Sequence, residues 1–342
     1  MRVLIDIGHP AHVHYFKFLI QKIEQNMGVV KVVAREKEVS HTLLNAYAIP
    51  FENRGKGGNG IIGKFIYLLK ATRFVKKIAF NFKPDIVLSF ASPYAAKAAY
   101  QLGIPHLALD DTEHANFARK FYLKYTTKVL TPKSFNIDLG PKHMRFDGFM
   151  EMCYLHPSVY HPNNNILNEL QLIPNEYFVV LRFVSFQASH DIGQTGMSYA
   201  FKTELISMLE EQGFKVFISS EAEIPEQFKK YKLTIAPEKM HDLLFHAFCF
   251  IGEGATMASE CAMLGTPAIY INSLDAGTLQ EQEKLGLIKG FRSEKEVKDK
   301  LKNWLLVPNR KIKTRQIAAD VLFKFKSPTD LIYNHLKNLS HH

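Results

Sequence analysis

The sequence has 342 residues, of which 46% are hydrophobic and 22% charged, and 43 Lys and Arg outnumber 33 Asp and Glu. These proportions are typical of globular proteins and exclude a disordered tail, a collagen-like repeat and a small disulfide scaffold. At about 100–200 residues per domain, the length predicts two domains. The net charge of +10 favours an anionic partner, such as phosphate, nucleic acid or an acidic membrane, without choosing among them.

The cysteines and the N-terminus bear on the cellular compartment. Cys153, Cys249 and Cys261 follow no metal-ligand or redox spacing, and the last two fall in apolar runs typical of reduced, buried thiols. The N-terminal apolar run is too short for a signal peptide, and Asp6 interrupts it. No apolar run approaches the roughly 20 residues that span a bilayer. We therefore expect a cytoplasmic protein, with peripheral contact to the inner face of the membrane as an open alternative.

Short β-branched runs alternate with stretches of helical period, which predicts βαβ units and a parallel sheet. In the first half we expect strands at 3–7, 29–34, 86–90, 106–109 and near 129–130. The helices predicted between them cover 13–23, 61–80, 95–102 and 113–125.

The alternation stops between about 149 and 174, where Pro, His and Asn are frequent, as in a linker between domains. It then starts again, with strands predicted at 177–183, 215–219, 233–236, 248–252 and 268–271. Helices are predicted at 198–212, 239–247 and 257–264, followed by a final set of charged helices. The fold class is therefore α/β, with two Rossmann-like parallel-sheet domains facing a central cleft. Ligands of such sheets bind beyond the carboxyl ends of the strands.

The loop after the first strand carries three histidines, His9, His12 and His14, directly after Gly8. Backbone amides and the dipole of the following helix favour an anion at this position. Histidine titrates near neutral pH, so catalysis or ligand contact is one reading. Metal binding and ordinary loop histidines are the alternatives. The loop lacks the second and third glycines of the dinucleotide fingerprint.

A second loop, between an apolar strand and a helix, contains Gly254, Ala255 and Thr256, which are small enough for the backbone to approach a diphosphate. Glu260 lies about one turn into that helix, where its carboxylate could accept hydrogen bonds from ribose hydroxyls. A Gly-rich turn with Glu260 as a solvated or dipole-pairing residue is the alternative.

Two further strand ends carry charged residues. Arg182 ends an apolar strand, where an unpaired guanidinium is costly to bury, so it is expected to face a phosphate or a carboxylate. The same loop continues with polar residues: Ser185, Gln187, His190 and Asp191. Asp110, Asp111 and Glu113 follow the strand at 106–109. Crowded carboxylates raise one another's pKa and serve as acid or base, although Asp111 as an N-cap is an equal alternative.

These motifs together resemble the glycosyltransferase-B (GT-B) superfamily, which includes the UDP-N-acetylglucosamine 2-epimerases. The segment EGATMASECAMLGTPAIYI (253–271) resembles the nucleotide-sugar segment of the lipid-linked N-acetylglucosaminyltransferase of peptidoglycan synthesis. The loop GHPAHVHY stands where that enzyme has GTGGH, which aligns His12 with its loop histidine, although His9 and Pro10 replace a Thr and a Gly. The segment PDIVLSF followed by GIPHLALDDTEHA is similar to the pattern of the epimerases, which is a PD strand, then GIP, then an acidic motif. Arg182 is placed like a phosphate-binding arginine of the epimerases.

Over roughly residues 1–305 the chain most resembles a bacterial and archaeal family, domain of unknown function 354. The similar segments are DIGHPAHVHYF, DDTEHA, RFVSFQASHDIGQTG and EGATMASE. The resemblance implies a GT-B fold, with an acceptor-side domain at 1–155 and a nucleotide-sugar domain at 165–305. Helices at 306–342 are expected to return to the N-terminal domain.

The leading hypothesis is a metal-independent transferase that uses a nucleotide sugar, UDP-linked, in bacterial surface-polysaccharide assembly, with no cofactor. His12, Asp111 or Glu113 would take the proton of a sugar or lipid-linked acceptor. The expected donor contacts are Gly8, His9, Arg182, Gly254, Ala255, Thr256, Glu260, Thr278, Gln280 and, next to them, Gln282. A nucleotide-sugar 2-epimerase and a non-enzymatic nucleotide-sugar binding protein are the rival readings.

The helix predicted at 61–80 is basic and amphipathic. An ordinary solvated helix face is the expected reading, and contact with anionic lipid or a lipid-linked acceptor is the alternative. Its cations are Lys64, Lys70, Arg73, Lys76 and Lys77. Nucleic acid is not an expected partner, because no recognised module or aromatic-basic interleave is present.

Overall fold

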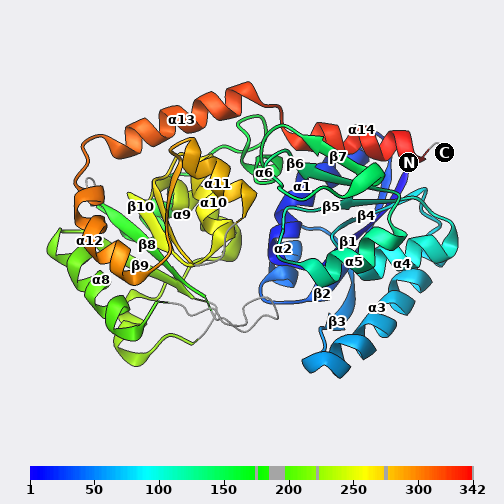
Figure 1. The fold of residues 1–342 in the computed structure, drawn as a ribbon, viewed down its shortest axis with the longest axis horizontal. Coiled ribbons are helices and arrows are strands. Elements are labelled where there is room, and N and C mark those ends of the chain that lie inside the picture. The colour runs from blue at the N-terminus through cyan, green and yellow to red at the C-terminus, as the bar shows by residue number, and fades with distance from the viewer. Residues whose placement is uncertain (174–175, 185–196, 221–222, 273–275, 341–342) are drawn as a thin grey trace. The chain divides into compact units, whose positions relative to one another are not determined.

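The computed structural model describes residues 1–173, 176–184, 197–220, 223–272 and 276–340. It divides the chain into two compact units: unit 1 is Met1–Val159 with Phe325–His342, and unit 2 is Tyr160–Lys324. Each unit contains one parallel sheet with helices packed against it (Figure 1). The predicted pair of Rossmann-like parallel-sheet domains is confirmed.

The sheet of unit 1 has the strand order β3-β2-β1-β4-β5-β6-β7, and its paired strands are all parallel. The order reverses between β1 and β4, which makes this pair a topological switch point, where ligands of open α/β sheets bind. The strands are β1 (Arg2–Ile7), β2 (Val29–Glu36), β3 (Phe51–Lys56), β4 (Ile86–Phe90), β5 (His106–Leu109), β6 (Lys128–Pro132) and β7 (His143–Phe146).

Helix α1 (Pro10–Gln25) buries an apolar stripe against the sheet of unit 1. In α1 the stripe contains Val13, Phe16, Leu19 and Ile23, at the three- to four-residue spacing of a helix face. The C-terminal helix α14 (Pro328–Ser340) packs on α1, and Thr329 Oγ1 donates to the carbonyl of Cys153 at 3.2 Å. The other helices are α2 (Ser40–Ala46), α3 (Gly60–Phe82), α4 (Pro93–Leu102), α5 (Asn116–Tyr125), the 3-10 turn Gly140–Lys142 and α6 (Met152–Leu155).

The sheet of unit 2 has the order β12-β11-β10-β8-β9, again parallel. Its strands are β8 (Phe178–Phe183), β9 (Lys215–Ser220), β10 (Cys249–Gly252), β11 (Ala268–Ile271) and β12 (Ile288–Phe291). Its helices are α7 (Asn165–Glu169), α8 (Tyr199–Glu211), α9 (Met240–His246), α10 (Ala255–Leu264), α11 (Gly277–Lys284), α12 (Glu294–Leu305) and α13 (Arg310–Lys324), with 3-10 turns at Glu226–Tyr231 and Pro237–Lys239.

Several predicted elements differ from the structure. The strand predicted at 233–236 is wrong: a single bridge joins Lys232 to Ile218, and Pro237 then begins a 3-10 turn. Strands β3, β7 and β12 and helices α2, α6 and α7 are not predicted from the sequence, because segments of four to seven residues are too short to show a clear periodicity. Helix α5 begins at Asn116 rather than at 113. Across the described residues, no helix is long and apolar enough to cross a membrane.

Candidate functional site

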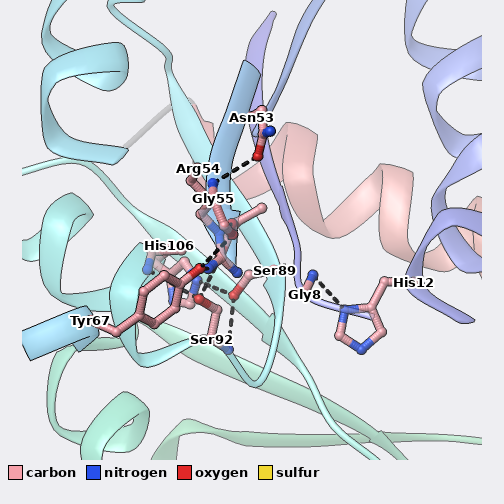
Figure 2. A network of polar contacts seen from close by, with 11 residues as sticks. Gly8, His12, Asn53, Arg54, Gly55, Tyr67, Ser89, Ser92 and His106 are labelled. Carbon is pink, nitrogen blue, oxygen red and sulfur yellow. Dashed lines mark hydrogen bonds and ion pairs between the residues drawn. The ribbon is translucent and has the colours of Figure 1, made fainter. Parts of the chain in front are cut away.

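The loop after β1 places two imidazole rings at the carboxyl edge of the unit 1 sheet. His9 is the N-cap of α1, and its Nδ1 accepts a hydrogen bond from the amide of Ala11 at 3.2 Å. In the first turn of α1, Nδ1 of His12 accepts from the amide of Gly8, also at 3.2 Å (Figure 2). The two ring centroids are 5.8 Å apart. Gly8, His9 and His12 thus form one hydrogen-bonded turn.

His12 is a neutral imidazole that carries its proton on Nε2. Burial, with smaller contributions from His9, Lys37 and Arg54, lowers the pKa of His12 well below its usual value. An amide N–H can only donate, so the Nδ1 that accepts from Gly8 holds a lone pair and the ring proton lies on Nε2. The ring is therefore arranged to donate a hydrogen bond from Nε2 rather than to take up a proton.

Asp111 is linked to this turn through Tyr15 of α1. The Tyr15 side chain hydrogen-bonds to Asp111, and its ring centroid lies 6.2 Å from that of His12 and 5.4 Å from that of Phe90. Burial, and then the charges of Asp110 and Glu113, raise the pKa of Asp111 to about 7. A carboxyl group with such a pKa can accept or release a proton near neutral pH, as a general base requires.

The neighbouring carboxylates are engaged elsewhere. Asp110 is fully buried and accepts hydrogen bonds from the Tyr122 hydroxyl at 2.5 Å and the Thr112 amide at 2.9 Å. Glu113 accepts from the amide of Asn136 at 2.6 Å, which ties it to the loop after β6. Of the two carboxylates expected to be catalytic, the structure links Asp111 to the histidine turn and Glu113 to this other loop.

A buried ion pair supports the histidine turn from within the sheet. Arg54 of β3 donates through Nε to Asp6 of β1 at 2.8 Å, and the two side chains are only 1% and 0% exposed. The Ser92 hydroxyl donates to the same carboxylate, and the guanidinium also bonds to the Tyr67 hydroxyl (Figure 2). A Cβ on Gly8 would lie 3.5 Å from Nη2 of Arg54, so the guanidinium packs against the turn.

The polar network continues into the sheet from Ser92, the N-cap of α4. The amide of Ser92 donates to the Ser89 hydroxyl, and Ser89 Oγ lies 2.9 Å from Nε2 of His106 (Figure 2). Nδ1 of His106 lies 2.8 Å from Thr126 Oγ1. Burial lowers the pKa of His106 to about 3. This histidine is therefore a neutral structural link that fixes the start of α4.

His14 is separated from the other two histidines. It is 6% exposed, its ring stacks on Tyr154 with centroids 5.2 Å apart, and its Nδ1 lies 3.4 Å from the Tyr47 hydroxyl. Within the described ranges, no group of three or more His, Cys, Asp and Glu side chains is placed to hold a metal ion. The alternative of a three-histidine metal site therefore has no geometry to support it.

In unit 2, Arg182 lies at the carboxyl edge of the sheet beside the start of α10. Its Nη1 donates to the Ser219 hydroxyl of β9 at 2.8 Å. A Cβ on Gly252 would lie 2.7 Å from Cβ of Arg182, and one on Gly254 would lie 3.3 Å from its Cγ. Glycine at 252 therefore allows β8 and β10 to approach closely at Arg182, and the Arg182 side chain lies against Gly254 at the start of α10.

The first turn of α10 has the properties of an anion site. Gly254 is the N-cap and provides no side-chain hydrogen bond, and the first turn contains no acidic residue. Ala255 is exposed, and Thr256 is half-buried. The amide groups of such a turn and the helix dipole together favour a phosphate. The predicted residues Arg182, Gly254, Ala255 and Thr256 are thus neighbours in the structure.

Two glutamates flank this turn. Glu253 is 2% exposed and its Oε2 accepts from the amide of Val184 at 2.9 Å, while its other oxygen accepts from the amide of Met197. Glu260 is 5% exposed, and its Oε1 lies 3.0 Å from Nε2 of His241 on α9. Glu253 therefore fixes both ends of the β8–α8 connection, and His241 fixes the orientation of Glu260.

The remaining expected donor contacts lie on α11, which follows β11 but precedes the last strand, β12. Thr278 is half-buried and Gln280 is exposed. Gln282 is fully buried and donates to Ser259 Oγ at 2.6 Å, and its expected contact with the sugar stays a prediction. Four of the polar positions named above lie outside the described residues: Ser185, Gln187, His190 and Asp191.

Sequence reasoning missed the partners that hold the site residues. Tyr15, Arg54 and His241 each reach a site residue through the tertiary fold, and no local pattern marks them. One signal was available: a carboxylate at position 6, inside an otherwise apolar strand, needs a buried partner.

Comparison with solved structures shows that the chain has the GT-B fold. The UDP-GlcNAc 2-epimerase of Neisseria meningitidis bound to UDP-GlcNAc is 12% identical, with a TM-score of 0.68 over 99% of this chain and 100% of that one. The glycosyltransferase VinC in complex with dTDP is also 12% identical, with a TM-score of 0.63 over the whole of both chains.

Residues 1–325 match the family described as "Protein of unknown function (DUF354)", and the chain belongs to this family. A curated relative is the uncharacterized protein MJ0665 of Methanocaldococcus jannaschii. The two sequences are 23% identical over an alignment 363 residues long, which covers 98% of each chain. The resemblance to this family that was stated from the sequence is confirmed, and the similar solved structures confirm the expected GT-B fold.

Proposed function

We propose that this protein is a glycosyltransferase that uses a nucleotide sugar, UDP-linked, in bacterial surface-polysaccharide assembly. The observation that carries the proposal is Arg182 beside the uncapped N-terminus of α10 at the carboxyl edge of the unit 2 sheet. The structures similar to this chain include one bound to UDP-GlcNAc and one in complex with dTDP, which supports a nucleotide ligand here. The proposed location is the cytoplasm, at the inner face of the membrane when the acceptor is lipid-linked.

The proposed donor chemistry requires no metal ion. Breaking the bond between sugar and phosphate leaves negative charge on the diphosphate. The Arg182 guanidinium and the first-turn amides of α10 would stabilise this charge as it develops. The carboxylate of Glu260, oriented by His241, would accept hydrogen bonds from the ribose. Thr278 and Gln280 would contact the sugar.

The proposed acceptor chemistry belongs to unit 1. Asp111, with a pKa of about 7, would take the proton of the acceptor hydroxyl as that oxygen attacks the anomeric carbon. Nε2–H of His12 would donate a hydrogen bond to an acceptor or donor oxygen and so orient it. Gly8 and His9 would supply the turn that holds His12. Glu113 would act indirectly, by positioning its loop.

A nucleotide-sugar 2-epimerase is the second candidate, favoured by the similarity to the Neisseria meningitidis enzyme and by a carboxyl group of near-neutral pKa. In that reaction Asp111 would remove the proton from C2 while UDP leaves C1, and UDP would then add back to C1 as a proton returns to the opposite face of C2. A two-domain nucleotide-sugar binding protein without activity is the third reading.

Incubation with UDP-GlcNAc alone separates these functions. An epimerase converts the donor without an acceptor, whereas a transferase leaves the sugar unchanged until an acceptor is supplied. We expect an unchanged sugar when the protein is alone and UDP release when a bacterial membrane extract provides acceptors. Formation of the C2 epimer, followed by NMR, would replace the transferase proposal with the epimerase. A bound but unconverted nucleotide sugar in both incubations would favour the binding protein.

A further inference from the structure

Helix α3 of unit 1 has an apolar outer face. Its inner face is buried at every fourth residue: Tyr67, Ala71, Val75 and Ala79. On the opposite side of the first two turns, Ile62, Phe65 and Ile66 are 77%, 61% and 46% exposed, and Phe80 near the end of the helix is 68% exposed. Single exposed apolar residues are common on protein surfaces, but three within five positions form a patch that needs a partner.

The same face is strongly basic. Helix α3 contains no acidic residue and five basic ones: Lys64, Lys70, Arg73, Lys76 and Lys77. Arg73, Lys76 and Lys77 lie about two to three helical turns after Ile66, which places them on the same side of the helix. In the part of the chain that the structure describes, none of these three cations forms an ion pair with a carboxylate.

We infer that the outer face of α3 docks on an anionic lipid bilayer, with Ile62, Phe65 and Ile66 inserted at the headgroup level and the cations facing lipid phosphates. Adjacent aliphatic, aromatic and unpaired basic side chains on one helix face are the pattern of interfacial helices. A second copy of this chain is a poorer partner, because each copy carries a net charge of +10. The inference is independent of the nucleotide site, although it fits a lipid-linked acceptor.

Co-sedimentation of the full-length protein with vesicles tests this inference. We expect binding to vesicles that contain 30% phosphatidylglycerol, weak binding to pure phosphatidylcholine, and loss of binding at high salt. Phe65→Ser should lower the partition coefficient about 10-fold. Lys76→Glu with Lys77→Glu should lower it by a similar factor. Both variants change exposed or half-buried groups, so circular dichroism should show unchanged folding, and UDP affinity should stay the same.

Matched control substitutions lie on α13, where Ile312 is 68% exposed and Lys313 is exposed. Ile312→Ser and Lys313→Glu should leave vesicle binding unchanged. Equal losses in the α3 and α13 variants, or no preference for the anionic vesicles, would overturn the inference. Self-association without vesicle binding would also overturn the inference. If the sedimentation coefficient of the wild type depended on concentration, and Phe65→Ser abolished this dependence, α3 would join two copies of the chain.

Discussion

Arg54→Met is expected to lower the free energy of unfolding of unit 1 by about 3–5 kcal/mol, because it leaves the Asp6 carboxylate buried without its partner. The Ser92 hydroxyl bond to Asp6 would remain, but one hydroxyl does not replace a guanidinium. Urea unfolding, with hydrogen exchange measured on the peptides of β1 and β3, would report the loss.

The double variant Asp6→Leu/Arg54→Met should recover at least half of that loss, since no buried charge is then left alone. The ion pair between Lys31 and Glu52 is the matched control, because it also involves β3 but has side chains 38% and 41% exposed. Lys31→Met should cost less than about 1 kcal/mol. Similar costs for Lys31→Met and Arg54→Met would show that the buried pair has no special role.

Asp111→Asn should lower the turnover of the nucleotide sugar about 10²–10⁴-fold, the usual contribution of a general base. The wild-type rate should rise with pH, and the midpoint of this rise should lie near pH 7, because only the carboxylate form of Asp111 accepts a proton. The variant should lose this pH dependence. Glu113→Gln is the control: its side chain reaches the amide of Asn136, so we expect a loss of less than about 10-fold. Equal losses in both variants would contradict the assignment of Asp111.

The same carboxyl group has a stability signature that needs no substrate. Its folded-state pKa of about 7 lies above its usual 3.8, so the stabilisation that comes from the protonated form is lost as the pH rises from about 4 to 7. Asp111→Asn is neutral at every pH. At pH 8 it should therefore be more stable than the wild type, by about 1–3 kcal/mol when partial exposure is allowed for, and the difference should vanish below pH 4.

The sequence predicted the class of the fold and the strand ends that carry the unusual residues, because both depend on local patterns. Apolar runs such as 86–90 become strands, and the glycines around Glu253 lie at the end of β10. The sequence did not predict β3, since FENRGK lacks both an apolar run and a clear alternation. It also did not predict the pairs formed by Asp6 with Arg54 and by Glu260 with His241, which depend on register and packing rather than on sequence spacing.

The nitrogen of His12 that carries the ring proton also could not be predicted from the sequence. Three histidines in one loop indicated acid–base chemistry, and the sequence treated His12 as a candidate base. The tautomer depends on the amide of Gly8, whose approach to Nδ1 follows from the geometry of the turn. The role of base therefore moves in our proposal to Asp111, whose pKa depends on burial that no local pattern reveals.

Isothermal titration calorimetry with UDP tests the nucleotide site most directly. We predict that UDP binds the wild-type protein without added metal and that Arg182→Ala weakens binding about 10–100-fold, as expected for a lost charge-assisted contact. Glu260→Ala should also weaken it, because the proposed ribose contact is removed. Arg310→Ala at the start of α13 removes a guanidinium that donates to the Trp304 carbonyl of α12, and this variant should bind UDP like the wild type. An Arg182→Ala protein with unchanged UDP affinity, or a wild-type protein that binds no nucleotide, would contradict the proposed site.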